Sequence, residues 1–277
     1  MNKLPLSQRT RIVAALVEGN SIRSTCRMTG AAKGTVLKLL VDLGRACETF
    51  QRTALVDLNC RRIQCDEIWS FCYAKAKNVP EEMKDQDGVG DVWTWTALDS
   101  DSKLIVSYLV GTRDAGCAYE FMGDVASRLA NRVQLTTDGH RAYLDAVADA
   151  FDGQVDFAQL VKLYGEAPNP ERRYSPARYT GSKKVPILGR PDLEQVSTSH
   201  VERQNLTMRM SMRRFTRLTN AFSKKIENHE AAIALHFMYY NFARVHQTLR
   251  VTPAMEAGIA DHAWSIEEVV GLLDSSN

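Results

Sequence analysis

The sequence predicts an α/β protein in which a mixed five-stranded sheet is covered by helices and preceded by an all-α helix-turn-helix domain. Three observations support this fold class. Apolar residues recur at helical spacing through residue 46, runs rich in β-branched and aromatic residues begin at Arg62, and helical and strand patterns alternate after Ala115. A chain of 277 residues with 44% hydrophobic content can bury one sizeable core and carry a small additional module.

The first 46 residues contain three expected helices. The first covers residues 6–18 and ends at Gly19, the second begins after Ser21, and the third runs from about Lys33 to Ala46. A helix-turn-helix motif requires a small residue in its first helix, glycine in the turn and an aliphatic residue in its second helix. Cys26, Gly30 and Val36 meet these requirements, although a plain three-helix bundle is the alternative.

We therefore assign residues 1–58 to a helix-turn-helix DNA-binding domain. Basic and polar residues of its second and third helices are the expected DNA contacts. These residues are Arg23, Arg27, Lys33, Thr35 and Lys38.

Residues 59–250 are expected to form the sheet domain. Strands are expected over residues 62–73, 92–99, 104–111, 133–137 and 155–164, and helices over residues 115–130 and 141–151. Within this domain, residues 164–198 contain five of the eight prolines and six Lys or Arg, which predicts an exposed basic insertion. Its residues Arg172, Arg173, Lys183 and Lys184 either contact DNA or form a solvated loop.

The formal net charge of +2 conceals a strong segregation of charge. Lys and Arg outnumber Asp and Glu by 11 to 4 in residues 1–62 and by 15 to 6 in residues 167–250. Acids predominate by 18 to 9 in residues 63–166, and residues 251–277 hold five acids and no basic residue, which suggests an acidic C-terminal tail. Two basic regions around an acidic one indicate a protein that binds DNA phosphates and cations. The alternative is that these charged segments are only solvated faces.

Three acids are candidate metal ligands and catalytic residues. Asp66 lies within an apolar strand, where an unpaired carboxylate is costly, and Asp138 ends a later strand at the sheet edge where ligands collect. Glu202 lies on a following helix. Such acids can hold two Mg²⁺ ions, with Mn²⁺ able to substitute, for phosphoryl transfer. The alternative is that they are surface acids brought together by chance.

Basic residues follow Glu202 without another acid before Glu227. This run would repel itself unless phosphates neutralise it, which points to double-stranded DNA. The expected DNA contacts here are Arg209, Arg213, Arg214, Arg217, Lys224 and Lys225.

The order of the helix-turn-helix, CDEIWSF, TTDGHRAYL, SHVERQN and RRFTRLTNAFSKKIENH resembles the transposases of the insertion-sequence-one family, within the larger DDE group. The resemblance implies an RNase H-like fold with helices on both faces of the sheet. It also implies the catalytic triad Asp66, Asp138 and Glu202, and a homo-oligomeric synaptic complex that joins element ends to target DNA. Family members often begin with a zinc-binding cysteine module, and no C-x-x-C pair occurs here.

Several neighbouring residues have a plainer interpretation. Glu67 should point to the opposite face of its strand from Asp66, so we do not expect it to be a ligand. His140 and His200 either contact the scissile phosphate or support the ligands by hydrogen bonds. The six cysteines are expected to be reduced core thiols. Without a long apolar run or a secretory signal, we expect a bacterial cytoplasmic, nucleoid-associated protein that has no membrane partner.

The sequence thus predicts a DDE transposase that cleaves DNA at element ends and transfers the freed 3′-hydroxyl to target DNA. Two alternatives remain. One is an RNase H-like nuclease or resolvase without strand transfer. The other is a helix-turn-helix DNA-binding regulator whose catalytic domain has lost its activity.

Overall fold

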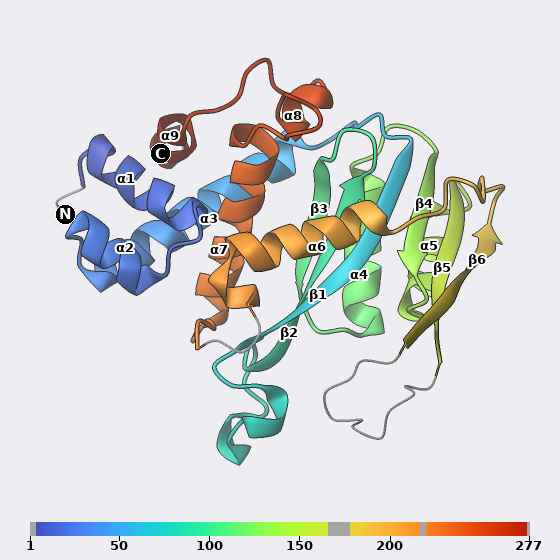
Figure 1. Cartoon of the computed structure of the whole chain (residues 1–277), viewed down its shortest axis with the longest axis horizontal. Coiled ribbons are helices and arrows are strands. Elements are labelled where there is room, and N and C mark those ends of the chain that lie inside the picture. Colours follow the sequence, from blue (N-terminus) through green and yellow to red (C-terminus); the bar gives the residue numbers. More distant parts are fainter. Residues whose placement is uncertain (1–3, 166–177, 217–219, 276–277) are drawn as a thin grey trace.

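The computed structural model describes residues 4–165, 178–216 and 220–275. The chain begins with three helices, which in Figure 1 lie to one side of the sheet. The sheet and its covering helices follow, and two short helices close the chain. The elements are α1 (Leu6–Val17), α2 (Ile22–Thr29), α3 (Lys33–Ala54), β1 (Arg62–Cys72), β2 (Gly90–Asp99), β3 (Ile105–Gly111), α4 (Ala115–Ser127), β4 (Val133–Asp138), α5 (Ala142–Phe151), β5 (Val155–Gly165), β6 (Arg178–Leu188), α6 (Ser199–Ser211), α7 (Ile226–Met238), α8 (Pro253–Glu256) and α9 (Ile266–Ser275).

The sheet is mixed and has six strands in the order β3-β2-β1-β4-β5-β6. The first three strands pair antiparallel, β1 and β4 pair parallel, and so do β4 and β5. The five expected strands are all present, but the prediction of a five-stranded sheet is wrong.

The sixth strand, β6, arises from residues 178–188, inside the expected insertion. It pairs antiparallel with β5 and lies at the edge of the sheet, where a proline such as Pro186 removes no essential hydrogen bond. Residues 189–198 are also tied to the sheet, because Gln134 exchanges two hydrogen bonds with the backbone of Asp192. Arg172 and Arg173 lie outside the described residues.

Helices cover both faces of the sheet, as expected. Along β1, Ile63 and Cys65 point to one face and pack with α4 and α5, while Ile68 points to the other face and packs with α6 and α7. This alternation follows from the two-residue repeat of a strand. Asp66 therefore shares the face of Ile68, which is the face covered by α6.

Helix α3 is longer than expected, since it continues to Ala54 rather than ending near Ala46. Its second half packs on α7, and a Cβ atom added at Gly44 would lie 2.5 Å from the Cα of Ala231. At the end of α3, the buried Arg128 donates to the carbonyl oxygens of Gln51 and Leu55. One continuous helix thus joins the N-terminal helices to the sheet domain.

Residues 251–275 are not an extended tail. They form α8 and α9, and Val269 and Val270 of α9 are fully buried in the core that includes α1 and α3. Arg9 of α1 pairs with Asp274 of α9 at 3.2 Å. The acidic end of the chain therefore lies on the basic N-terminal helices, which its sequence position does not reveal.

All six cysteines are free, and four are buried, in agreement with the expectation of reduced core thiols. Within the described ranges, every helix is too short or too polar to cross a bilayer.

The close approach of α3 and α7 can be tested with two glycines of the same helix. Gly44→Ala places a methyl group against the backbone of Ala231, and we expect a loss of about 1–3 kcal/mol in the free energy of unfolding. Gly34→Ala is the control, because its added Cβ meets nothing within 4 Å and should stabilise α3 by up to about 1 kcal/mol. Urea titrations measure both values, and equal effects would contradict the packing.

Candidate active site

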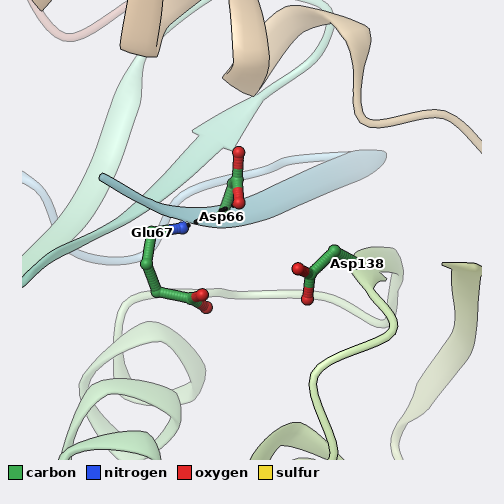
Figure 2. Close-up of side chains that lie close together, drawn as sticks. All are labelled: Asp66, Glu67 and Asp138. Atoms are coloured by element: carbon green, nitrogen blue, oxygen red, sulfur yellow. Dashed lines mark hydrogen bonds between the residues drawn. The ribbon is translucent and has the colours of Figure 1, made fainter. Parts of the chain in front are cut away.

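Asp66 and Asp138 lie on the two central, parallel strands β1 and β4, at the level where β4 ends, which we call the acidic edge. The β1 and β4 register pairs Cys65 with Thr137, so each acid is the next residue of its strand. Figure 2 shows the Asp66 and Glu67 side chains leaving β1 on opposite sides, with the Asp138 carboxylate across from both. One carboxylate oxygen from each of these three residues lies within 4.8 Å of the other two.

Asp66 is held by two hydrogen bonds. Its Oδ1 accepts from the backbone N–H of Glu67 at 2.9 Å, and its Oδ2 accepts from Asn205 Nδ2 of α6 at 2.8 Å. Burial and the negative charge of Asp138 raise the pKa of Asp66 to about 6, against the lowering effect of the Glu67 N–H. The negative charge of Glu202 also raises this pKa, while the positive charge of Lys162 lowers it. The site is therefore short of positive charge.

Glu67 points to the opposite face from Asp66, as predicted, yet its long side chain brings the carboxylate back towards Asp138. Only 1% of the Glu67 side chain is exposed, and Arg113 Nε donates to its Oε2 at 3.0 Å. Arg113 Nη2 also lies 3.6 Å from Asp138 Oδ2. Burial first, and then Asp138, raise the pKa of Glu67 to about 7. Arg113 thus occupies the space between Glu67 and Asp138.

Helix α6 carries Glu202 and is attached to β1 by polar contacts. Gln64 Oε1 accepts from the backbone N–H groups of His200 and Val201, at 2.9 and 3.2 Å, and so satisfies donors that the first turn of a helix leaves free. Two residues further along β1, Asp66 receives the hydrogen bond from Asn205. Gln64, Asp66 and α6 share one face of the sheet, so Glu202 is directed to the same edge.

Glu202 itself is engaged by other groups. Lys162 Nζ of β5 lies 2.7 Å from Glu202 Oε1, and the hydroxyl of Thr198 donates to the same oxygen. Burial opposes the charge of Lys162, but the hydrogen bond and the negative charge of Glu202 outweigh it and raise the pKa of Lys162. Among the described residues, the group of acids within 4.8 Å comprises Asp66, Glu67 and Asp138, and Glu202 is not part of it.

Hard divalent cations fit the chemistry of this site. Asp66 and Asp138 offer carboxylate oxygens, the ligands that Mg²⁺ prefers, and the raised pKa of Asp66 reflects negative charge that a cation would neutralise. Glu202 lies close enough to Asp66 to raise its pKa. Glu67 fits less well, because Arg113 already neutralises it from the other face of the sheet.

The two histidines differ in their contacts, and only His140 hydrogen-bonds a proposed ligand. The backbone N–H of His140 donates to Asp138 Oδ1 at 2.8 Å, and its ring packs against Trp95 and Tyr143. Burial, followed by the charge of Arg113, lowers the pKa of His140. The ring Nε2 of His200 lies 3.4 Å from Lys103 Nζ.

The predicted DNA contacts lie on two surfaces. In the N-terminal helices, the four basic side chains Arg23, Arg27, Lys33 and Lys38 are exposed, and Thr35 is half-buried. Lys38 forms an ion pair with Asp42 at 2.7 Å. Helix α6 ends at Ser211, earlier than the sequence suggests, so the following basic residues lie on a turn and a loop.

In this second group, exposure varies. Arg213, Lys224 and Lys225 are exposed, whereas Arg209 and Arg214 are half-buried. Arg217 lies outside the described residues. Arg23, Lys33, Arg213, Arg214 and Lys224 line a single cleft.

No protein-family model and no curated protein matches the chain. Among solved structures, the similar ones include the Mos1 transposase paired-end complex with left transposon end, at 12% identity and a TM-score of 0.25, over 57% of this chain and 60% of that one. The Mos1 strand transfer complex has 13% identity and a TM-score of 0.25, over 85% of this chain and 78% of that one. A pre-cleavage Mos1 transpososome has 11% identity and a TM-score of 0.24, over 86% of this chain and 80% of that one. The part matched in the first of these structures is thus about three fifths of its length.

Sequence reasoning missed Gln64, Asn205, Arg113 and Lys162. A signal existed for two of them. Gln64 lies two residues before Asp66 and so on the same face of the strand, and Asn205 lies one helical turn after Glu202. Arg113 and Lys162 come from other elements, and nothing in their local sequence indicates a carboxylate partner.

The raised pKa values predict how pH and metal affect stability. In the unfolded chain, Asp66 and Glu67 have pKa values of about 4. In the folded chain they therefore retain protons at pH values where the unfolded chain has lost them. Their contribution to the free energy of unfolding therefore falls as pH rises from about 4 to 7. Because metal binding requires ionised carboxylates, Mg²⁺ or Mn²⁺ should raise the melting temperature more at about pH 8 than at about pH 5.

Asp138→Asn provides the control in these melting experiments. The variant retains an oxygen for the His140 N–H and removes one of the repelling charges, so its metal-free stability at about pH 8 should be at least that of the parent. The stabilisation by metal should disappear. An equal metal effect at both pH values, or in this variant, would show that the ion binds elsewhere.

Lys162 should compete with a divalent cation for Glu202. Replacing it by methionine removes the ammonium group 2.7 Å from Glu202 Oε1, so the affinity for Mn²⁺ in the absence of DNA should rise several-fold. Calorimetric titration measures the affinity. Lys183→Met is the matched control, because Lys183 lies on the adjacent strand β6 and is exposed. A fall or no change in affinity for Lys162→Met would mean that Glu202 takes no part in binding.

Proposed function

We propose that the protein is a DDE transposase, which cleaves DNA phosphodiesters at the ends of an insertion element and transfers the freed 3′-hydroxyl to target DNA. One observation carries the proposal. Asp66 and Asp138 adjoin on parallel strands, and α6, which bears Glu202, is hydrogen-bonded to Asp66 itself through Asn205. This arrangement supports Asp66, Asp138 and Glu202 as the catalytic and metal-binding residues.

The proposed cofactor is a pair of Mg²⁺ ions, for which Mn²⁺ can substitute. When bound, such a pair activates the attacking oxygen and stabilises the leaving oxygen of an in-line displacement at phosphorus. Asp66 and Asp138 provide oxygens from the sheet edge. Glu202 completes the set when it leaves Lys162, and Asn205 and the Glu67 N–H keep the Asp66 carboxylate oriented.

The same site can serve cleavage and joining, because both are displacements at phosphorus that differ only in the attacking hydroxyl. Lys162 and Arg113 place positive charge beside the acids. In the complex with DNA, Lys162 is well placed to transfer its ion pair from Glu202 to a phosphate, since the contact is partly exposed.

The wider assignments belong to the same proposal. The strand order, with an antiparallel β1-β2-β3 unit beside parallel β4 and β5, supports an RNase H-like catalytic domain. Gly30, which ends α2 at φ 72°, and the buried Val36 of α3 support a helix-turn-helix that contacts duplex DNA. Membership of the insertion-sequence-one family, a homo-oligomeric synaptic complex and a bacterial, nucleoid-associated location complete the proposal.

A single assay tests the activity. The protein is incubated with Mg²⁺ or Mn²⁺, a labelled duplex carrying an element end, and a target plasmid. We expect joined product from the parent protein. We expect neither cut nor joined product from Asp66→Asn, Asp138→Asn or Glu202→Gln, with DNA binding nearly unchanged, because each substitution removes one carboxylate charge from the site.

Asp145→Asn, on the exposed face of α5, is the matched control and should cut and join normally. Cut product alone would support a nuclease or resolvase, and binding without cutting would support a regulator. Normal cutting by any one of the three site variants would remove that residue from the catalytic set.

A further inference from the structure

A cleft of about 730 Å³ separates the N-terminal helices from the end of α6 and the start of α7. One wall is formed by the α1–α2 turn and the first turns of α2 and α3, and the other by residues 211–214 and 220–224. The two walls touch at Gly19, where an added Cβ would lie 2.7 Å from the carbonyl oxygen of Ser211. Leu37, Leu40 and Leu235 provide an apolar lining.

The charge of the cleft has one sign. Its lining includes Arg23 and Lys33 from the N-terminal wall, and Arg213, Arg214 and Lys224 from the other, and it includes no Asp or Glu. In the part of the chain that the structure describes, none of these five side chains forms an ion pair. Uncompensated basic groups on facing walls attract an extended anion.

Arg214 gives the strongest indication. The residue is half-buried, and its guanidinium donates to the hydroxyl of Ser223, which in turn contacts the buried His229. Burial lowers the pKa of Arg214 to about 10 and that of His229 to about 3. The imidazole of His229 is therefore neutral and does not compensate the charge of Arg214. Keeping a guanidinium in this position without a carboxylate is costly, and a phosphate in the cleft would offset that cost.

We propose that this cleft binds the phosphate backbone of the DNA that the helix-turn-helix contacts, and leads that DNA towards the acids of the same subunit. The inference rests on the proposed function and names the path of its substrate. Lys33 lies at the N-terminus of α3, where no side chain caps the first-turn N–H groups and the helix dipole is positive. Backbone donors at this end are thus available to a phosphate.

The distance along α6 is suitable for such a path. Ser211 borders the cleft, and Glu202 lies nine residues earlier on the same helix. At 1.5 Å per residue, the separation along the axis is about 14 Å. Phosphates of one strand are spaced by about 3.4 Å along the duplex, so roughly four nucleotides span the interval from the cleft to the acids. Arg209 lies between them on α6.

A salt titration of DNA binding tests the cleft. The probe is a fluorescein-labelled duplex of random sequence, about four helical turns long, and binding to the full-length protein is followed by anisotropy. Each phosphate contact adds about 0.9 to the slope of log affinity against log salt. Arg213→Ala/Lys224→Ala removes two exposed cleft cations and should reduce the slope by about 2, with weaker binding at every salt concentration.

Arg11→Ala/Lys77→Ala is the matched control, because it removes the same charge from two exposed sites outside the cleft. This control variant should change the slope of log affinity against log salt by less than half of the change caused by the cleft variant. Melting temperatures equal to the parent's verify that both double variants fold. Equal slopes for the cleft variant and the parent would overturn the proposal.

The outcomes separate this inference from the proposed activity. If the parent has a steeper salt slope than the cleft variant but neither cuts nor joins DNA, the cleft assignment stands and the transposase proposal fails. If the parent joins DNA and the cleft variant binds as the parent does, only the cleft assignment fails. A parent protein that does not bind the duplex overturns the cleft assignment, whereas the joining assay alone decides the transposase proposal.

Discussion

The attachment of α6 to β1 is the interaction on which the site depends. An apolar contact would hold the helix against the sheet but would allow it to slide, whereas two polar contacts fix both its position and its rotation. Gln64 satisfies the first-turn donors of α6, and Asn205 donates to Asp66 one helical turn after Glu202. Because Gln64 and Asp66 alternate on one face of the same strand, displacement of α6 breaks both contacts together. The position of Glu202 thus follows from β1.

Besides the hydrogen bonds accepted by Asp66 and Asp138, two basic side chains compensate the charge of the acids. Arg113 lies between Glu67 and Asp138 on one face of the sheet, and Lys162 engages Glu202 on the other. Burial first, and then the negative charge of Asp138 nearby, raise the pKa values of Asp66 and Glu67. A divalent cation, if bound as proposed, would relieve both the repulsion and the burial of uncompensated charge.

The local sequence predicts most of the elements but not their partners. Strong apolar periodicity identifies the first five strands and the placement of Asp138 at the end of β4. Edge strand β6 escapes prediction because prolines and basic residues, which are disfavoured in central strands, are tolerated there. The folding of residues 251–275 onto α1, and the pairing of Lys162 with Glu202, are long-range contacts between segments whose own sequences carry no signal of each other. Asp66 and Asp138 are brought together as the strand pattern suggests. Glu202 lies beside them, but it forms an ion pair with Lys162.

The continuity of α3 limits how this chain can vary in length. Its first turn borders the basic cleft, Gly44 lies against Ala231 of α7, and Arg128 binds the carbonyl groups at its far end. An inserted residue between Lys33 and Gly44 would advance one end by about 1.5 Å and rotate it by about 100° relative to the other. Any surface on the first turn would then face a different direction while the sheet stayed in place. Substitutions on the exposed side of α3 leave this relation unchanged, whereas single insertions and deletions do not, because the helix fixes the orientation of the N-terminal surface relative to the acidic edge of the sheet.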